Sequence, residues 1–182
     1  LLPDAQPVHH HPYDIPHSSL QTFKATLEFY CKIGVLRRCG ASEWGLPTFI
    51  IPKKDGTVRW VSNFRELNKV IKRKVYPLPR IIDILRKRSS YKYFTKLDIT
   101  MQYYTFELDE ESKELCVIIT PFGQFQHNRL PMGVKIAPDI AQETMEDIFC
   151  DIEEVDVYID DVGTFNDEWD AHLHTLERVL QR

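Results

Sequence analysis

Two adjacent carboxylates at the tip of a predicted β-hairpin constrain this chain more than any other feature. Apolar Val155, Val157 and Ile159 alternate with outward-facing neighbours, which predicts a strand with one buried face. The strand ends at Asp160-Asp161, and Val162 to Phe165 resumes the extended pattern. A hairpin of this kind is stable only when other elements cover its apolar face. Together with the helices and strands expected elsewhere in the chain, it indicates an antiparallel sheet with helices packed on one face.

The rest of the chain reads as helices that alternate with short extended segments. Helices are expected after a Ser18 or Ser19 cap, after Pro79, over 137–150 and from Trp169. Their expected buried faces are Leu20, Phe23, Leu27, Tyr30 and Cys31; Ile81, Ile82 and Leu85; Ile140, Met145, Ile148 and Phe149; and Trp169, Leu173, Leu176 and Leu180. Strands are expected at 48–51, 58–62, 91–99, 104–108, 115–120 and 124–129, with a turn at Lys53-Lys54-Asp55-Gly56. Since the chain has neither an internal repeat nor a glycine-rich phosphate loop, this order indicates an α+β fold.

Asp160-Asp161 and a third carboxylate, Asp98, are residues of the type that binds metal ions. Adjacent carboxylates repel each other unless a cation lies between them, and Mg²⁺ commonly binds one or two carboxylates together with substrate phosphates. Asp98 also follows a predicted strand. A two-metal phosphoryl-transfer site needs acidic ligands from separate strands. The alternative is a solvated turn, because aspartate is common in turns, and an isolated Asp-Asp pair would favour that alternative.

The net charge of −4 conceals opposite charges in two parts of the chain. Residues 53–92 contain 13 Lys and Arg against 3 Asp and Glu, whereas residues 136–177 contain 14 Asp and Glu and no Lys or Arg. The pattern argues against a uniformly basic nucleic-acid binder. It suits a basic lobe that holds phosphates beside an acidic lobe that holds cations. The alternative is two solvated surfaces of opposite sign that attract each other.

Membrane association is not expected. No apolar run approaches the roughly 18 residues that a membrane span needs, and the N-terminus lacks the charged and then apolar order of a signal peptide. The sequence therefore predicts an intracellular protein.

Seven short motifs follow one another along the chain from about Pro7 onward. They are Ile51-Pro52-Lys53-Lys54-Asp55-Gly56, Asn63-Phe64-Arg65-Glu66-Leu67-Asn68, Tyr76-Pro77-Leu78-Pro79-Arg80, Phe94-Thr95-Lys96-Leu97-Asp98, Thr120-Pro121-Phe122-Gly123, Leu130-Pro131-Met132-Gly133 and Tyr158-Ile159-Asp160-Asp161. In this order and spacing they resemble the reverse transcriptase domain of gypsy-type long-terminal-repeat (LTR) retrotransposons, and more distantly that of retroviruses. Asn63 stands where the family commonly has aspartate, and Thr100-Met101-Gln102 where Arg-Ser-Gly is typical.

The resemblance implies the fingers and palm subdomains of a right-hand polymerase with an antiparallel palm sheet. Residues 1–17 would be an extended lead-in, 18–92 mainly fingers and 93–182 mainly palm, with the fingers returning within about 115–135. The implied activity is RNA-directed DNA polymerisation, a nucleotidyl transfer from a deoxynucleoside triphosphate (dNTP) to a primer 3′-hydroxyl. Two Mg²⁺ ions would serve it, and Mn²⁺ could substitute. The alternatives are an inactive retroelement relic that at most binds nucleic acid, and another palm-type nucleotidyl transferase such as a nucleotide cyclase.

The resemblance also implies functional residues, position by position. Asp98, Asp160 and Asp161 would be the catalytic, metal-binding carboxylates. The dNTP would contact Lys53, Arg59, Tyr103 and Met132, and the Tyr103 ring would leave no space for a 2′-hydroxyl. The template and primer would contact Arg65, Phe122, Gly123, Pro131, Gly133, Gln142, Tyr158 and Ile159.

The partners that the resemblance implies are an RNA or DNA template with its primer, dNTPs and the remaining domains of a retroelement polyprotein. The expected location is the cytoplasm, within a virus-like particle, with a nuclear phase. Enzymes of this family continue into a thumb and an RNase H domain, and their elements usually encode a protease and an integrase. None of the seven motifs corresponds to those domains, so they are expected to be absent from this chain.

Overall fold

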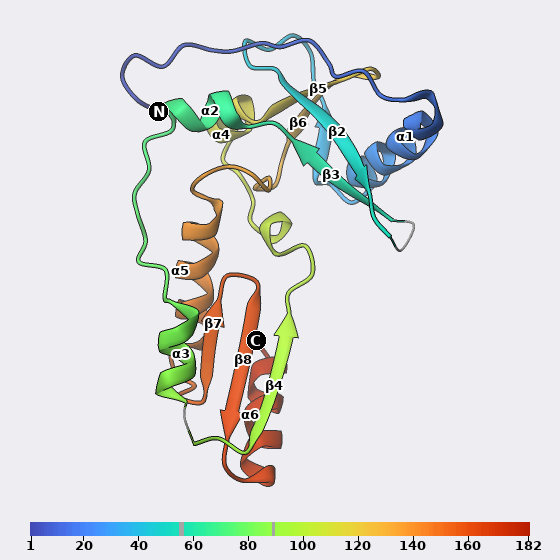
Figure 1. Ribbon diagram of the computed structural model, residues 1–182. Coiled ribbons are helices and arrows are strands. Elements are labelled where there is room, and N and C mark those ends of the chain that lie inside the picture. The colour runs from blue at the N-terminus through green and yellow to red at the C-terminus, as the bar shows by residue number, and fades with distance from the viewer. Residues whose placement is uncertain (55–56, 89) are drawn as a thin grey trace. The chain divides into compact units, whose positions relative to one another are not determined.

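The chain divides by its internal contacts into two compact units. The computed structural model describes residues 1–54, 57–88 and 90–182. The first unit comprises residues 1–73 and 103–137, and the second comprises residues 74–102 and 138–182 (Figure 1). Residues 74–92, which the sequence analysis assigned mainly to the fingers, thus group with the second unit. The assignment of the units to fingers and palm stays a prediction.

The first unit contains a mixed β-sheet and short helices. Its elements are α1 (His17–Lys32), β1 (Leu36–Arg38), β2 (Leu46–Pro52), β3 (Val58–Ser62), α2 (Arg65–Val70), α4 (Glu110–Leu115), β5 (Val117–Thr120) and β6 (Gly123–His127). The strand order is β1-β6-β5-β2-β3, and the β2–β5 pair is parallel. Phe23 and Tyr30 of α1 pack on the Trp60 ring, with centroid distances of 4.8 and 5.5 Å. These aromatic contacts fix α1 to the sheet.

The expected hairpin of β2 and β3 is confirmed, with Ile51 opposite Arg59. The turn predicted at its tip includes residues 55–56, which lie outside the described residues. The predicted lead-in is extended and mostly exposed over residues 1–16, where it forms a bridge from His9 to Gly45. A Cβ atom at Gly45 would lie 2.6 Å from the His9 ring and 2.5 Å from Ile119, so the bridge requires glycine there.

The second unit is an antiparallel sheet with two helices on one face (Figure 1). Its elements are α3 (Ile81–Lys87), β4 (Tyr93–Asp98), α5 (Ala137–Phe149), β7 (Val155–Tyr158), β8 (Asp161–Asn166) and α6 (Trp169–Leu180), and its strand order is β4-β8-β7. Met145 and Phe149 from α5 and Val179 from α6 share one core with Val155, Val157 and Val162. The α+β prediction is confirmed.

Two predicted buried faces are wrong. Ile81, Ile82 and Leu85 of α3 are 54, 50 and 48% exposed. On α6, the apolar face including Trp169 and Leu180 is exposed as well, and the buried residues are His172, Thr175 and Val179. The physical reason on α6 is hydrogen bonding.

The His172 ring explains how α6 buries a polar face. Its Nε2 lies 2.8 Å from Thr95 Oγ1, and its Nδ1 lies 2.8 Å from Asn166 Oδ1. Asn166 Nδ2 in turn donates to Thr175 Oγ1 at 3.0 Å. A buried polar group is tolerated when its partners are present, so helical periodicity of apolar residues alone misidentified the inner face.

Three local predictions also differ from the structure. The expected strand at 104–108 is a short 3₁₀-helix at Gln102–Thr105 followed by a single bridge from Glu107 to Arg129. The helix α4 was missed; its cap is Asp109, whose carboxylate accepts the Ser112 N–H at 2.6 Å. Helix α1 begins at His17, so the Ser18 or Ser19 cap is wrong. Within the described residues, no helix is both long and apolar enough to cross a membrane.

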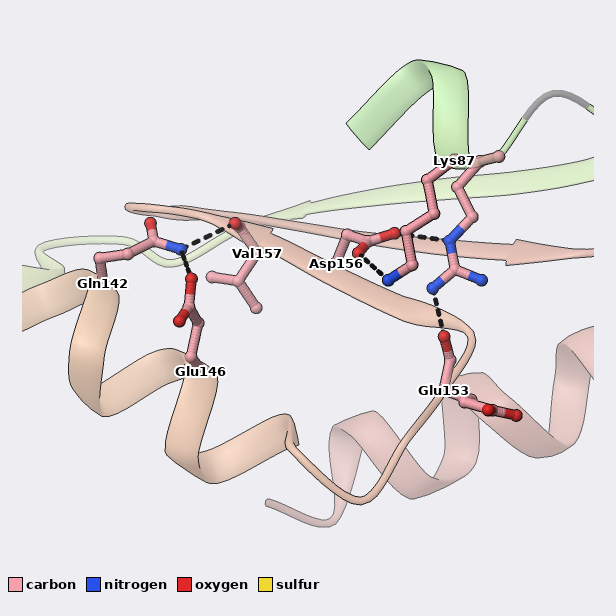
Figure 2. A network of polar contacts seen from close by, with 7 residues as sticks. Lys87, Gln142, Glu146, Glu153, Asp156 and Val157 are labelled. Carbon is pink, nitrogen blue, oxygen red and sulfur yellow. Dashed lines mark hydrogen bonds and ion pairs between the residues drawn. The ribbon is translucent and has the colours of Figure 1, made fainter. Parts of the chain in front are cut away.

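The basic segment 53–92 is divided between the two units instead of forming one lobe. In the second unit it contacts acidic residues directly. Asp156 accepts from Lys87 Nζ at 3.0 Å and from Arg88 Nε at 2.6 Å, and Arg88 also donates to the Glu153 carbonyl (Figure 2). In this part of the chain, the basic residues therefore form ion pairs with acidic residues, as expected for two surfaces of opposite charge that attract each other.

Candidate active site

The register of the second sheet brings the three predicted carboxylates together. Tyr158 pairs with Asp161 across the β7–β8 hairpin, so Ile159 and Asp160 form its two-residue turn. Asp98, the last residue of β4, is the direct partner of Asp161 on β8. The Ile99 N–H donates to the Asp160 carbonyl at 2.9 Å. Cβ atoms of directly opposed residues lie about 4.5–5.5 Å apart. The pairing with Asp161 therefore brings Asp160, 62 positions after Asp98 in the chain, back beside it.

The turn that carries Asp160 has an unusual backbone conformation. Ile159 has φ +56°, in the left-handed region that β-branched residues rarely adopt. It occupies the first central position of a two-residue hairpin, where positive φ matches the twist of the strands. Holding a non-glycine residue there costs roughly 1–3 kcal/mol, and surrounding contacts must offset this cost.

Two glutamine side chains supply those contacts. Gln142 of α5 is fully buried, and its Oε1 accepts the Ile159 N–H at 2.7 Å. Its Nε2 donates to the Val157 carbonyl at 3.0 Å (Figure 2). Gln102, 3% exposed, donates from Nε2 to the Ile159 carbonyl at 2.9 Å. Both backbone polar groups of Ile159 are therefore held by side chains. Gln142 was predicted to contact the template or primer, and Gln102 was noted only as a departure from the family pattern.

Lys96 neutralises part of the acidic cluster, and the sequence analysis missed it. Its Nζ lies 2.8 Å from Asp161 Oδ2. The hydrogen bond to Asp161, with the charges of Asp161, Asp98 and Asp160, raises the pKa of Lys96 above its ordinary value. A signal was available: Lys96 is two residues before Asp98 on a strand, and alternate residues share a face.

Replacing Lys96 with methionine is expected to tighten Mn²⁺ binding to the carboxylates about threefold. The ammonium competes with a metal ion for Asp161 and repels the positive charge of the ion, so its loss favours metal binding; in water the effect is modest. The measurement is a titration of free Mn²⁺ by electron paramagnetic resonance. Lys92→Met is the matched control, because Lys92 precedes β4 at its other end and lies 3.9 Å from Glu168. An unchanged Kd in Lys96→Met would contradict the expectation.

The donor set fits a hard divalent cation, since it consists of carboxylate oxygens on two adjacent strand ends. One of these carboxylates also binds the ammonium group of Lys96. In the present rotamers, Asp161 binds Lys96, and no three His, Cys, Asp or Glu side chains of the described residues converge as a set of metal ligands. Asp98 and Asp160 are exposed, which leaves their side chains free of steric restraint by the core. Binding a metal ion would require Asp161 to exchange Lys96 for the ion.

The predicted dNTP and template residues other than Gln142, Tyr158 and Ile159 belong to the first unit. Lys53 follows β2, and Arg59 lies on β3; both are exposed, and the Lys53 N–H donates to the Thr57 carbonyl at 2.8 Å. Arg65 begins α2 and is exposed. Tyr103 is half-buried in the 3₁₀-helix. The structure thus places Lys53 and Arg59 on one hairpin.

Two loops of the first unit carry the other predicted residues. Phe122 and Gly123 lie at the β5–β6 turn, where Gly123 has φ +119° and the Phe122 ring stacks on Phe23 at 6.2 Å. Pro131, Met132 and Gly133 form the other loop. Gly133 has φ +98°, and its carbonyl accepts Asn68 Nδ2 at 2.7 Å. Asn68 Oδ1 accepts the Lys135 N–H at 2.8 Å, so one side chain fixes this loop. Met132 is 44% exposed.

Comparisons with known proteins identify the family. The family described as reverse transcriptase (RNA-dependent DNA polymerase) matches residues 51–182. The retrovirus-related Pol polyprotein from transposon 412 of Drosophila melanogaster is 33% identical over 169 residues, which cover 88% of this chain and 14% of that polyprotein. A crystal structure of prototype foamy virus protease-reverse transcriptase matches with a TM-score of 0.90 at 28% identity, over 98% of this chain and 24% of that chain.

A further solved structure, the foamy viral protease-reverse transcriptase in complex with an RNA/DNA hybrid, matches with a TM-score of 0.89. At 22% identity, over 98% of this chain and 24% of that chain, it shows likeness of fold.

The fold and the family match define the class: the chain belongs to the reverse transcriptase (RNA-dependent DNA polymerase) family. More narrowly, the transposon 412 relative confirms its resemblance to the enzymes of gypsy-type LTR retrotransposons. Members of this family generally use divalent metal ions. The chain spans about a seventh of the transposon 412 polyprotein and about a quarter of the foamy virus chain.

Proposed function

We propose that this chain forms the polymerase centre of a retrotransposon polyprotein and catalyses RNA-directed DNA synthesis. The observation that carries the proposal is the direct pairing of Asp98 with Asp161, next to Asp160 at the hairpin tip. Asp98, Asp160 and Asp161 would hold two Mg²⁺ ions, with Mn²⁺ as a substitute. Bound metal would lower the pKa of the primer 3′-hydroxyl and offset the charge of the triphosphate.

Residues of the first unit would bind the substrates. Lys53 and Arg59, exposed on one hairpin, would pair with the triphosphate, because cationic donors suit a highly charged phosphoryl group. The Tyr103 ring would lie under the sugar and exclude a 2′-hydroxyl, and Met132 would line the same pocket.

The template and primer would be held mainly through phosphates, so binding would weaken with salt. We assign these contacts to exposed Arg65, to the two glycine turns of the first unit and to the catalytic hairpin. The residues are Arg65, Phe122, Gly123, Pro131, Gly133, Tyr158 and Ile159. For Gln142 we propose a role inside the protein, because its side chain is fully buried and its amide contacts protein groups.

Primer extension tests the proposed function. The purified chain, and a longer protein that continues past Arg182, would be incubated with an RNA template, a DNA primer, dNTPs and Mg²⁺ or Mn²⁺. We expect extension that depends on the metal and stops on chelation, with Asp160→Asn as the inactive control. Extension that persists after chelation or in Asp160→Asn would contradict the proposed site. If neither protein extends a primer but both bind it, the inactive relic becomes the better account.

A further inference from the structure

The Tyr76-Pro77-Leu78-Pro79-Arg80 motif has no place in the chemistry proposed above, although it is among the clearest motifs of the sequence. The structure gives Tyr76 specific contacts. Its hydroxyl donates to Glu146 Oε2 at 2.5 Å, and its N–H donates to Asp139 Oδ1 at 3.4 Å. The hydrogen bond to Glu146 raises the pKa of Tyr76 to about 12. Both acceptors lie on α5, so the motif is attached to that helix.

Helix α5 connects this motif to the catalytic turn. Asp139, Gln142 and Glu146 are three and then four residues apart, which places them on one face of the helix. Gln142 Nε2 donates to Glu146 Oε1 at 2.6 Å (Figure 2). On the other side, Gln142 Oε1 accepts the Ile159 N–H at 2.7 Å. A continuous chain of hydrogen bonds therefore runs from the Tyr76 hydroxyl to the backbone of the strained residue in the turn.

Glu146 determines which way the Gln142 amide faces. The Gln142 NH₂ group lies between two acceptors, the Glu146 carboxylate and the Val157 carbonyl. A flipped amide would direct its oxygen at both acceptors and its NH₂ group at the Ile159 N–H, and all three contacts would be unfavourable. Because Tyr76 binds the second oxygen of Glu146, it fixes the carboxylate that sets this orientation.

We propose that Tyr76 and Glu146 are positioning residues, which orient Gln142 and so hold the Ile159-Asp160 turn in its strained conformation. The structural part of this inference concerns the second unit alone. The consequence of this inference for catalysis rests on the proposed function, because it assumes that Asp160 and Asp161 bind the catalytic metal ions. Tyr76 would thus support the hairpin that carries Asp160 and Asp161, through Glu146 and Gln142.

Amide hydrogen exchange of the Ile159 N–H, measured by NMR on the 182-residue chain, tests the inference directly. Losing Glu146 in Glu146→Ala is expected to speed exchange at Ile159 about tenfold, and Tyr76→Phe about threefold, as expected for hydrogen bonds with a net worth near 1 kcal/mol. Glu146→Gln should retain protection, since its carbonyl can accept from Gln142 and its NH₂ can donate to the Tyr76 oxygen.

Two references separate this effect from general loosening. The Phe165 N–H, which donates to the Glu154 carbonyl at 2.9 Å at the other end of the hairpin, should exchange at an unchanged rate. Tyr91→Phe removes the same hydroxyl from a tyrosine of the second unit whose ring packs on Phe94 and Phe165, and should leave Ile159 unaffected. Equal acceleration at Ile159 and Phe165 would show only a loss of packing and would overturn the inference.

The outcomes also separate this inference from the proposed function. Where primer extension occurs, Tyr76→Phe should lower kcat about threefold with an unchanged KM for dNTP, and Glu146→Gln should restore what Glu146→Ala loses. If exchange at Ile159 is faster in Glu146→Ala and Tyr76→Phe but the wild type extends no primer, the positioning network is supported. That result would count only against the proposed polymerase function. Unchanged exchange at Ile159 in both Glu146→Ala and Tyr76→Phe would overturn the inference, whatever the polymerase assay gives.

Discussion

Replacing Asp98 with asparagine is expected to slow primer extension on the order of a thousandfold, about 4 kcal/mol of transition-state stabilisation. Asparagine has the same shape but no charge, so it would be a poor ligand for a metal ion that must offset the charge of a triphosphate. Asp98 is exposed at the end of β4, opposite Asp161. The loss therefore follows from the chemistry of the carboxylate, and the unfolding free energy should change by no more than about 0.5 kcal/mol.

The Asp98 prediction can be checked at two levels. In the form of the protein that extends a primer, single-turnover rates of Asp98→Asn and wild type are compared at saturating dNTP. In the chain alone, Asp98→Asn should raise the Kd for Mn²⁺ about tenfold, by about 1.4 kcal/mol. The matched control is Asp167→Asn, since Asp167 is an exposed aspartate directly after the opposite end of β8. Wild-type rates in Asp98→Asn would exclude Asp98 from the catalytic site.

The hairpin that carries Asp160 and Asp161 was predictable because its signal is local. Val155, Val157 and the paired aspartates follow one another within a few residues, and period-two alternation fixes which side chains face the core. The pairing of Asp98 with Asp161, in contrast, has no local signal in the sequence. It depends on the register between strands that are far apart in the chain, and residue spacing does not encode a register. That pairing was predicted from the family resemblance alone.

Polar side chains with buried partners were the main failure of the sequence analysis. Periodicity assigned the inner face of α6 to its large apolar residues, but His172 is buried there because Thr95 and Asn166 satisfy both ring nitrogens. A pattern of apolar residues does not show which polar groups will find partners. On α5 a signal did exist, since Gln142 and Glu146 lie four residues apart on a helix beside a strongly acidic turn.

Gln102 illustrates a departure that the structure explains. It stands where the family typically has glycine, and its side chain donates to the Ile159 carbonyl at 2.9 Å. A glycine could not make that hydrogen bond. The positive φ of Met101, +57°, precedes it and directs the chain away from β4 into the 3₁₀-helix. The substitution thus adds a contact to the strained turn without removing a carboxylate.

Acid is expected to destabilise the first unit strongly because of His127, which the sequence analysis did not single out. The side chain is 1% exposed, and its ring lies between Phe64 and Tyr104, at centroid distances of 6.0 and 6.5 Å. Among the described residues, neither ring nitrogen has a hydrogen-bond partner. Burial lowers the pKa of His127 to about 3, from an ordinary value near 6.5. The folded unit therefore tolerates only the neutral imidazole.

The sign of the pH dependence follows from which state binds the proton. Below about pH 6.5 the unfolded chain protonates His127, whereas the folded chain does not until about pH 3. Stability is thus complete above pH 6.5 and is lost as pH falls, by about 1.4 kcal/mol per pH unit between those limits. Over two units this is a large part of the roughly 5–15 kcal/mol that a typical domain has.

Urea unfolding of wild type and His127→Leu at pH 7, 6, 5 and 4, followed by tryptophan fluorescence, isolates this contribution. Leucine has a similar volume and no ring nitrogens, so at pH 7 the variant should be as stable as the wild type or more stable. The gap should then widen by about 1.4 kcal/mol per unit as pH falls, because the carboxylates contribute equally to both proteins. His174→Leu, at a histidine whose side chain is 72% exposed on α6, should show no such widening. Parallel pH profiles for His127→Leu and wild type would show that the buried imidazole does not limit stability in acid, and the carboxylates would then have to account for the whole loss.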